Sequence, residues 1–168
     1  PRKARTMNPA EDDIQRAWQT YLAALPLDHP HRTRPLPAAW SFGDSPEMAD
    51  ELGGLVCAGI KTATCSLMWG YEMGVDPMPQ VGDLSLILDG RGRVMALIET
   101  VELRQRAYED VDAVFAAEEG EDDRSLQSWR EGHWRYFTRE CQTLGRTFTP
   151  QAPLLCERFR LVWRAGEV

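Results

Sequence analysis

The sequence lacks the features of several large protein classes. No two of its cysteines form a Cys-x-x-Cys pair, and its three histidines do not have zinc-finger spacing. No apolar run approaches the ~18 residues of a membrane helix, and no segment resembles a signal peptide. We therefore expect a soluble cytoplasmic protein, with no membrane partner, whose thiols stay reduced: Cys57, Cys65, Cys141 and Cys156.

Positive charge is also scarce. The chain has 19 Lys and Arg against 26 Asp and Glu, a net charge of −7. This balance weighs against a protein that coats duplex DNA, because phosphate binding needs clustered basic side chains. A local basic cleft on an acidic body remains compatible with it, so any contact with RNA is expected to be short and confined to one site.

What is present indicates a globular α+β protein. The 168 residues, 43% of them hydrophobic, suit one domain. Helical spacing and capping residues, among them Asn8, Ser45 and Ser125, predict helices at residues 8–25, 45–59, 110–117 and 125–144. Extended segments are predicted at residues 39–43, 61–66, 84–88, 94–103 and 154–163. Because helices and strands do not alternate regularly, we expect a mostly antiparallel sheet or barrel.

We expect three parts along the chain. Residues 1–7 are predicted to be a disordered or tag-like N-terminus, and residues 8–37 a helix followed by a Pro-rich strap. Residues 38–168 are predicted to form the main domain. The strap is expected to pack with that domain as one compact unit, because residues 8–37 are too few to fold alone.

The segment Gly59-Ile60-Lys61-Thr62-Ala63-Thr64 is a candidate catalytic motif. A hydroxyl needs a nearby base or charge to become a nucleophile, and a lysine with a lowered pKa can supply it. Residues three apart in a regular strand point to opposite faces, so Lys61 and Thr64 can cooperate only if the chain bends or bulges. The alternative is an ordinary strand with a surface lysine.

Three further groups of residues are candidates. Glu119 ends a short acidic stretch before a glycine and is predicted to turn into a cleft as a general acid or base, although such stretches are usually solvated surface. On the following helix, Arg130 and His133 are candidates for holding a phosphate or base, or for a structural role beside a core. Trp40 and Phe42 alternate in an extended segment, as in a core strand or as in an aromatic wall for a nucleobase.

Spacing predicts no cofactor and no metal site. A divalent ion would need acidic residues that the fold brings together, and the candidates for that are Asp44, Glu99 and Glu119.

Together these segments resemble the ASCH domain family, a branch of the PUA-like superfamily, in its longer bacterial form. The resemblance covers about residues 40–163. It rests on motifs that occur in a fixed order: Trp-Ser-Phe-Gly-Asp-Ser at 40–45, Ala-Asp-Glu-Leu at 49–52, the Gly59 motif at 59–64, Val-Gly-Asp at 81–83, Glu-Glu-Gly at 118–120 and Trp-Arg-Glu-Gly-His at 129–133.

The resemblance implies a small PUA-like β-barrel with flanking helices, an extra N-terminal helix and a cleft for RNA or a nucleobase derivative. A shorter branch of the family deacetylates acetylcytidine with a Lys, Thr and Glu set, which would fall on Lys61, Thr64 and Glu119. Ribonuclease activity is attributed to the longer form. We therefore expect a hydrolase acting on single-stranded RNA or a modified nucleoside. The alternatives are a non-catalytic RNA-binding module and an interaction domain without an RNA role.

Overall fold

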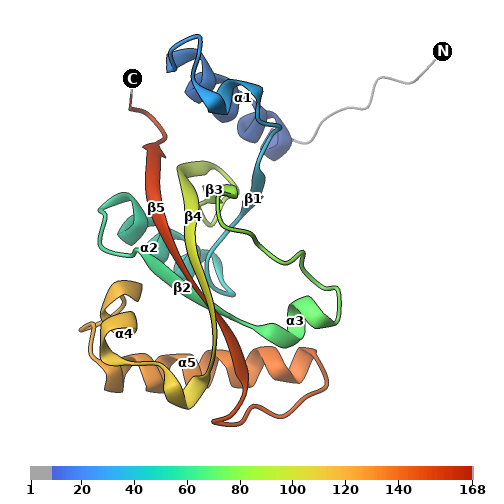
Figure 1. The fold of residues 1–168 in the computed structure, drawn as a ribbon, viewed down its shortest axis with the longest axis vertical. Helices are drawn as coiled ribbons and strands as arrows, with labels where there is room; N and C mark the ends of the chain where they lie inside the picture. The colour runs from blue at the N-terminus through green and yellow to red at the C-terminus, as the bar shows by residue number, and fades with distance from the viewer. Residues whose placement is uncertain (1–8, 168) are drawn as a thin grey trace, which may run out of the picture. The chain divides into compact units, whose positions relative to one another are not determined.

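The computed structural model describes residues 9–167. Its helices are α1 (Pro9–Ala24), α2 (Pro46–Cys57), α3 (Met68–Glu72), α4 (Ala113–Glu119) and α5 (Leu126–Thr143), with short 3₁₀ helices at Pro30–Thr33 and Tyr108–Asp110. Its strands are β1 (Ala38–Trp40), β2 (Ala63–Leu67), β3 (Leu84–Leu88), β4 (Val94–Ala107) and β5 (Pro153–Arg164) (Figure 1). No helix in this part of the chain is long and apolar enough to cross a membrane.

The strands are hydrogen-bonded in the order β1-β3-β4-β5-β2. The β1–β3 pair is parallel and the β2–β5 pair is antiparallel. Strands β4 and β5 also run antiparallel, because the Ala165 N–H donates to the Met95 carbonyl near one end and the Tyr108 N–H to the Ala152 carbonyl near the other. The sheet is therefore mostly antiparallel, and the predicted α+β fold class is confirmed.

The described chain divides into two compact units. The first unit contains residues 9–57, 84–98 and 161–167, and its core is the apolar face of α1 packed on β3 and β4. Trp18 and Tyr21 of α1 are buried there with Leu86 and Leu97. The Asp13 carboxylate accepts a hydrogen bond from the Val94 N–H at 3.0 Å, which fixes the helix against the start of β4.

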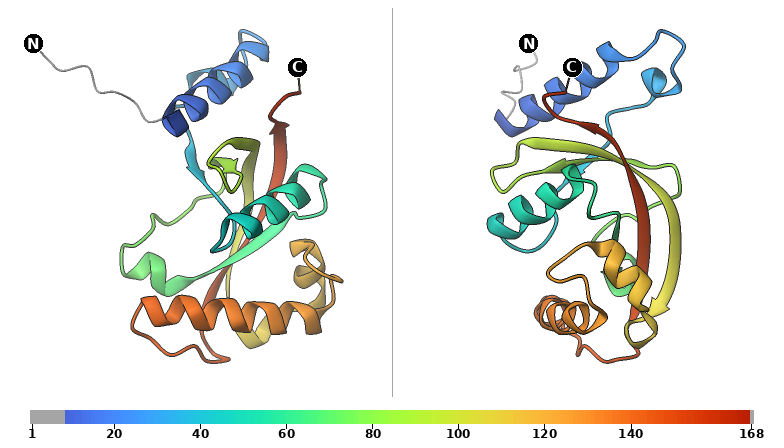
Figure 2. Two further views of the ribbon diagram at one scale, coloured as in Figure 1. Left: turned by 180° about the vertical axis from the view of Figure 1, so that it is seen from behind. Right: turned by 90° about the vertical axis from the view of Figure 1, so that its left-hand side faces the viewer.

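The second unit contains residues 58–83 and 99–160. Helices α4 and α5 cover one face of the β2–β5 pair (Figure 2). Phe115 of α4 and Trp129 and Phe137 of α5 are buried against Ala63 of β2 and Leu154 of β5. All the candidate residues from Lys61 to His133 lie in this unit, so its two helices determine where they point.

Most predicted elements are confirmed, with boundaries shifted by a few residues. The Ser125 side chain caps α5 by accepting from the Ser128 N–H at 3.1 Å, and the Ser45 hydroxyl accepts from the Met48 N–H at 3.2 Å. Three elements were not predicted: α3 and the two 3₁₀ helices, at Pro30–Thr33 inside the Pro-rich strap and at Tyr108–Asp110. The predicted Asn8 cap and the tail at residues 1–7 lie outside the described residues. That residues 8–37 and 38–168 fold as one unit stays a prediction.

Candidate functional site

The turn after α4 positions the candidate carboxylate. Gly120 ends the helix in the left-handed conformation, with φ of 74°. A Cβ at this position would lie 2.8 Å from the Ile60 carbonyl oxygen, so the two backbones can approach each other only at a glycine. The Thr62 N–H donates to the Glu118 carbonyl at 2.8 Å beside this contact. The segment before β2 is thereby held against the end of α4, which brings Lys61 to Glu119.

Lys61 forms a buried ion pair at this junction. Its side chain is only 1% exposed, and its ammonium donates to the Glu119 carboxylate at 3.0 Å and to the Glu121 carboxylate at 2.7 Å. A third bond, at 3.3 Å, goes to the Glu119 backbone carbonyl. Glu121 is 24% exposed and connects this otherwise enclosed pair to solvent.

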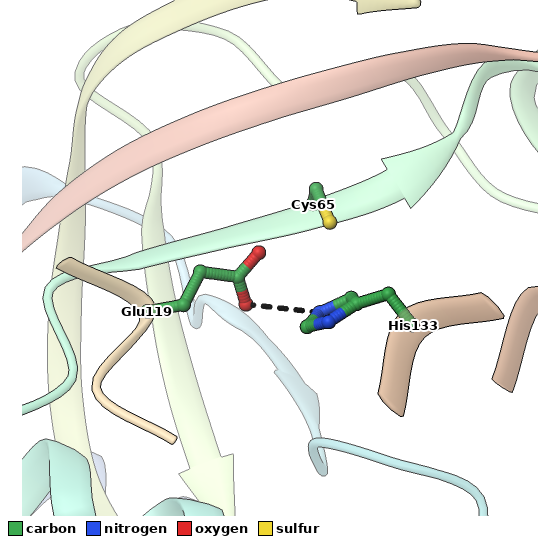
Figure 3. A group of neighbouring side chains, drawn as sticks. All are labelled: Cys65, Glu119 and His133. Atoms are coloured by element: carbon green, nitrogen blue, oxygen red, sulfur yellow. Dashed lines mark ion pairs between the residues drawn. The ribbon is translucent and has the colours of Figure 1, made fainter. Parts of the chain in front are cut away.

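Glu119 is the centre of the group, and four side chains converge on it. Its Oε2 accepts from Lys61 and lies 3.4 Å from His133 Nε2, while its Oε1 accepts from the Trp129 indole N–H at 3.1 Å. The Cys65 sulfur lies within 4.8 Å of a Glu119 carboxylate oxygen. Figure 3 shows Cys65 from β2, Glu119 from the end of α4 and His133 from α5 pointing toward one another. We call Lys61, Cys65, Glu119, Glu121, Trp129 and His133 the Lys61 cluster.

The charges of the cluster stabilise one another. Burial alone raises the pKa of Glu119, but the adjacent Lys61 and then His133 hold that pKa well below its usual range. Burial lowers the pKa of Lys61, yet Glu119 and Glu121 outweigh it and leave the pKa above its ordinary value. The pKa of His133 is likewise raised by Glu119 despite burial. Lys61 is therefore a permanent cation and Glu119 a permanent carboxylate near neutral pH.

Thr64 lies on the other face of β2. The β2–β5 register is uninterrupted from Ala63 to Leu67, so side chains alternate and Thr64 points away from the face that carries Cys65. Its partner in the register is Glu157, whose Oε1 accepts a 2.5 Å hydrogen bond from the Thr100 hydroxyl. Thr64, Thr100 and Glu157 form a second polar group, the Glu157 face. The structure thus brings Lys61 to Glu119 but does not bring Thr64 to them.

The predicted binding residues have different environments. His133 is 12% exposed and stacks on Trp129 at a centroid distance of 4.3 Å. Arg130 is exposed on α5, and its backbone carbonyl accepts from the Tyr108 hydroxyl. In the first unit, Phe42 is buried and Trp40 is half-buried, with their rings edge to face at 4.7 Å. Trp40 and Arg130 therefore keep surface that a ligand can reach.

Asp44, Glu99 and Glu119 were the acidic candidates for binding a divalent ion. The Glu99 carboxylate is paired with the Arg160 guanidinium at 2.8 Å. Asp44 belongs to the first unit.

Sequence reasoning missed several members of these groups, among them Glu121, Cys65 and Glu157. Glu121 lay in an acidic stretch interpreted as solvated surface, although it is two residues from Glu119. Cys65 was treated only as a buried thiol. Glu157 occupied an apolar position of the alternating strand that we expected at 154–163, and a lone acid at such a position is the pattern that could have indicated a buried carboxyl group.

Comparison with known proteins agrees with this architecture. A family model described as the ASCH domain matches residues 38–163. The chain belongs to the ASCH domain family. The ASCH domain is a PUA-like fold associated with RNA binding. No curated protein matches the sequence.

Two crystal structures are similar over nearly the whole chain. The ASCH domain from Lactobacillus crispatus has 30% identity and a TM-score of 0.83, over 94% of this chain and 96% of the other. Protein EF3133 from Enterococcus faecalis has 34% identity and a TM-score of 0.80, over 90% and 89%. The N-terminal helix therefore belongs to a shared architecture, because both matches extend well beyond residues 38–163.

Proposed function

We propose that this ASCH protein is a hydrolase acting on single-stranded RNA, with the Lys61 cluster as its reaction site. The observation that carries the proposal is the Lys61 ammonium, buried between the carboxylates of Glu119 and Glu121. A cation held in a site shielded from water stabilises developing phosphate charge far more strongly than one on the surface.

The ionisation of Lys61 favours phosphate chemistry over the acetylcytidine alternative. To activate the Thr64 hydroxyl, Lys61 would have to be neutral, and its pKa is raised rather than lowered. Thr64 also faces the other side of β2. A permanent cation suits the stabilisation of the negative charge that develops on a phosphate during hydrolysis.

A substrate would reach Lys61 at the position of the Glu121 carboxylate. That carboxylate accepts a hydrogen bond from the Lys61 ammonium, and of the two carboxylates that pair with Lys61 it is the more exposed one. The loop that follows holds two non-glycine residues, Asp122 and Arg124, at positive φ of 49° and 64°. Such backbone conformations cost free energy and are frequent where loops rearrange or bind ligands. We infer that an RNA phosphate displaces the Glu121 carboxylate and takes its place beside Lys61.

An exposed side chain of the second unit would hold more of the RNA. Arg130 can contact a neighbouring phosphate, and His133 lies on the same helix one turn further on. Within the first unit, taken by itself, the Trp40 ring with Phe42 edge-on beside it stays a predicted stacking surface for a base. With Arg130 as the exposed cation on α5, the RNA contact in the second unit would be only a few nucleotides long.

The test is hydrolysis by the pure protein of a labelled single-stranded RNA and, separately, of acetylcytidine. We expect RNA fragments and no deacetylation. Lys61→Met removes the cation, and the double variant Lys61→Met/Glu119→Gln removes it without leaving an unpaired buried charge. Both variants are expected to lose RNA cleavage. Equal cleavage by the wild type and a folded double variant would refute the role of Lys61, and deacetylation in place of RNA cleavage would favour the amidohydrolase.

A second candidate, a non-catalytic RNA-binding module, is favoured by one observation. Both carboxylate oxygens of Glu119 have protein partners, Oε2 with Lys61 and His133 and Oε1 with Trp129, so the cluster is satisfied internally. This candidate predicts saturable RNA binding with a shallow salt dependence and no product. Fluorescence anisotropy with the same RNA distinguishes it from the hydrolase, because binding without turnover would be retained after long incubation.

A further inference from the structure

The Lys61 cluster also contains an arrangement of donor atoms suited to a metal ion. The Cys65 sulfur, a Glu119 carboxylate oxygen and a His133 ring nitrogen all lie within 4.8 Å of one another (Figure 3). We propose that these three side chains form a binding site for one divalent ion of the zinc class, with the fourth position left for water. This inference depends on neither RNA binding nor RNA cleavage.

The donor distances fit a tetrahedral ion. His133 Nε2 and Glu119 Oε2 are 3.4 Å apart. Two ligand atoms that are each about 2.0–2.1 Å from a tetrahedral zinc ion lie about 3.3 Å from each other. Only the thiol needs to close in, and Cys65 projects from the regular strand β2 toward the other two. Cysteine sulfur, histidine nitrogen and carboxylate oxygen are all zinc ligands, and a zinc site that keeps one position open has three protein ligands.

Protein groups outside the set already orient two of the three ligands. His133 Nδ1 lies 2.9 Å from the Trp129 backbone carbonyl, so that nitrogen carries a proton and Nε2 faces Glu119. The Trp129 indole N–H holds the second oxygen of Glu119 at 3.1 Å. Hydrogen bonds of this kind set the tautomer and direction of metal ligands in proteins. One buried tryptophan thus aims both side chains at the same point.

The positive charge of Lys61 opposes the binding of a metal cation nearby, and the carboxylates of the cluster offset that charge. The ammonium donates to the same Glu119 oxygen at 3.0 Å, but it is also paired with Glu121 at 2.7 Å. A carboxylate oxygen has two lone pairs, so one can accept from Lys61 while the other binds a metal. When the ion binds, it replaces the thiol proton of Cys65 and the proton that His133 shares with Glu119. One dication enters, two protons leave, and the charge of the cluster does not change.

The donor set selects the ion. A thiolate and an imidazole favour Zn²⁺ or Co²⁺ over Mg²⁺ and Ca²⁺, which prefer oxygen ligands. Co²⁺ is the useful probe, because a cysteine thiolate bound to it gives a charge-transfer absorption that carboxylates and imidazoles do not. The absorption therefore reports directly on Cys65.

The experiment titrates reduced, metal-free full-length protein with Co²⁺ and then adds Zn²⁺. We expect a thiolate-to-cobalt band that saturates at one equivalent and disappears when Zn²⁺ displaces the probe, while a large excess of Mg²⁺ leaves it unchanged. Cys65→Ser is expected to abolish the band, and His133→Gln to weaken Co²⁺ binding by at least about 100-fold.

Cys156→Ser is the matched control. Cys156 lies directly opposite Cys65 in the β2–β5 register and is buried, but it is not one of the three donors. This variant is expected to keep the band at full intensity. A band that survives Cys65→Ser, or that is lost in Cys156→Ser, would overturn the assignment. The wild type decides the question even if a variant fails to fold, because a protein that shows no band at any Co²⁺ concentration has no such site.

Discussion

The two faces of the β2–β5 pair shift the pKa of a buried glutamate in opposite directions. On the helix-covered face, Glu119 accepts from Lys61, Trp129 and His133, and its pKa falls well below the usual range. On the Glu157 face, Glu157 has one hydroxyl partner, Thr100, and no cation in the described structure contacts it. Burial therefore raises the pKa of Glu157, and Asp83 adds to the effect. Two glutamates in one unit differ because only one has partners of opposite charge.

This difference indicates what each face can do. A carboxylate fixed in its ionised form by a buried cation provides a stable electrostatic field, which is what charge stabilisation or ion binding requires. A carboxyl group whose ionisation is only weakly compensated instead changes its protonation with pH and makes the stability of the fold depend on pH. We therefore place the chemistry on the helix-covered face, and four changes would break or sharpen that distinction.

The largest effect is expected from Lys61→Met. The change leaves Glu119 buried and ionised without its main partner, which costs about 3–5 kcal/mol of folding free energy. Urea denaturation at neutral pH measures it. The double variant Lys61→Met/Glu119→Gln is expected to recover most of the loss, because neither charge remains. A loss below about 1 kcal/mol for the single variant would show that the pair is solvated, contrary to its 1% exposure.

The next effect concerns the turn that joins the two segments of the cluster. Gly120→Ala is expected to cost about 2–4 kcal/mol, because it combines a left-handed backbone with a Cβ 2.8 Å from the Ile60 carbonyl oxygen. Gly145→Ala is the control: φ there is 66°, but nothing lies within 4 Å of the added Cβ. It should cost only about 1–2 kcal/mol in the same denaturation experiment. Equal costs would mean that the close approach to Ile60 is not a constraint.

A smaller effect is expected for Glu121→Gln on RNA affinity. The change removes the negative charge that competes with a phosphate for Lys61, worth on the order of 1 kcal/mol or about fivefold in Kd. Anisotropy titration with a short single-stranded RNA measures it. Glu131→Gln, an exposed carboxylate on α5, is the control and should change affinity far less. Weaker binding in Glu121→Gln than in the control would contradict displacement of Glu121 by the RNA.

The smallest effect is a change in pH dependence in Glu157→Gln. The pKa of Glu157 is raised on folding, so the folded state binds this proton more tightly than the unfolded state. Its contribution to stability is therefore present below the unfolded pKa of about 4.3 and is lost as pH rises through the folded pKa. The glutamine variant should gain stability relative to the wild type between pH 4 and pH 7. For Glu119→Gln, the pKa is lowered and the sign is the opposite.

The sequence predicted the elements better than the site. Helix caps such as Ser125 and the 3–4 spacing on α5 are local signals, so most boundaries could be found without coordinates. The partnership of Lys61 with Glu119 came only from the resemblance to ASCH domains, because 58 residues separate them. Glu121 and Cys65 were not found at all. The acidic residues at this turn are directed inward by contacts between distant segments, Gly120 with Ile60 and Thr62 with Glu118, that no periodicity encodes.

The most direct test of the account follows the Lys61 ammonium itself by NMR. The sequence contains only two lysines, Lys3 and Lys61, so labelling with ¹⁵N-lysine gives two signals that a Lys61→Met spectrum assigns. We predict that the Lys61 ammonium stays protonated above the ordinary lysine pKa of about 10.4. We also predict that single-stranded RNA shifts its signal while duplex DNA does not. A Lys61 signal that titrates below that pKa, or that no RNA perturbs, would contradict the claim that a paired, permanent cation forms the reaction site.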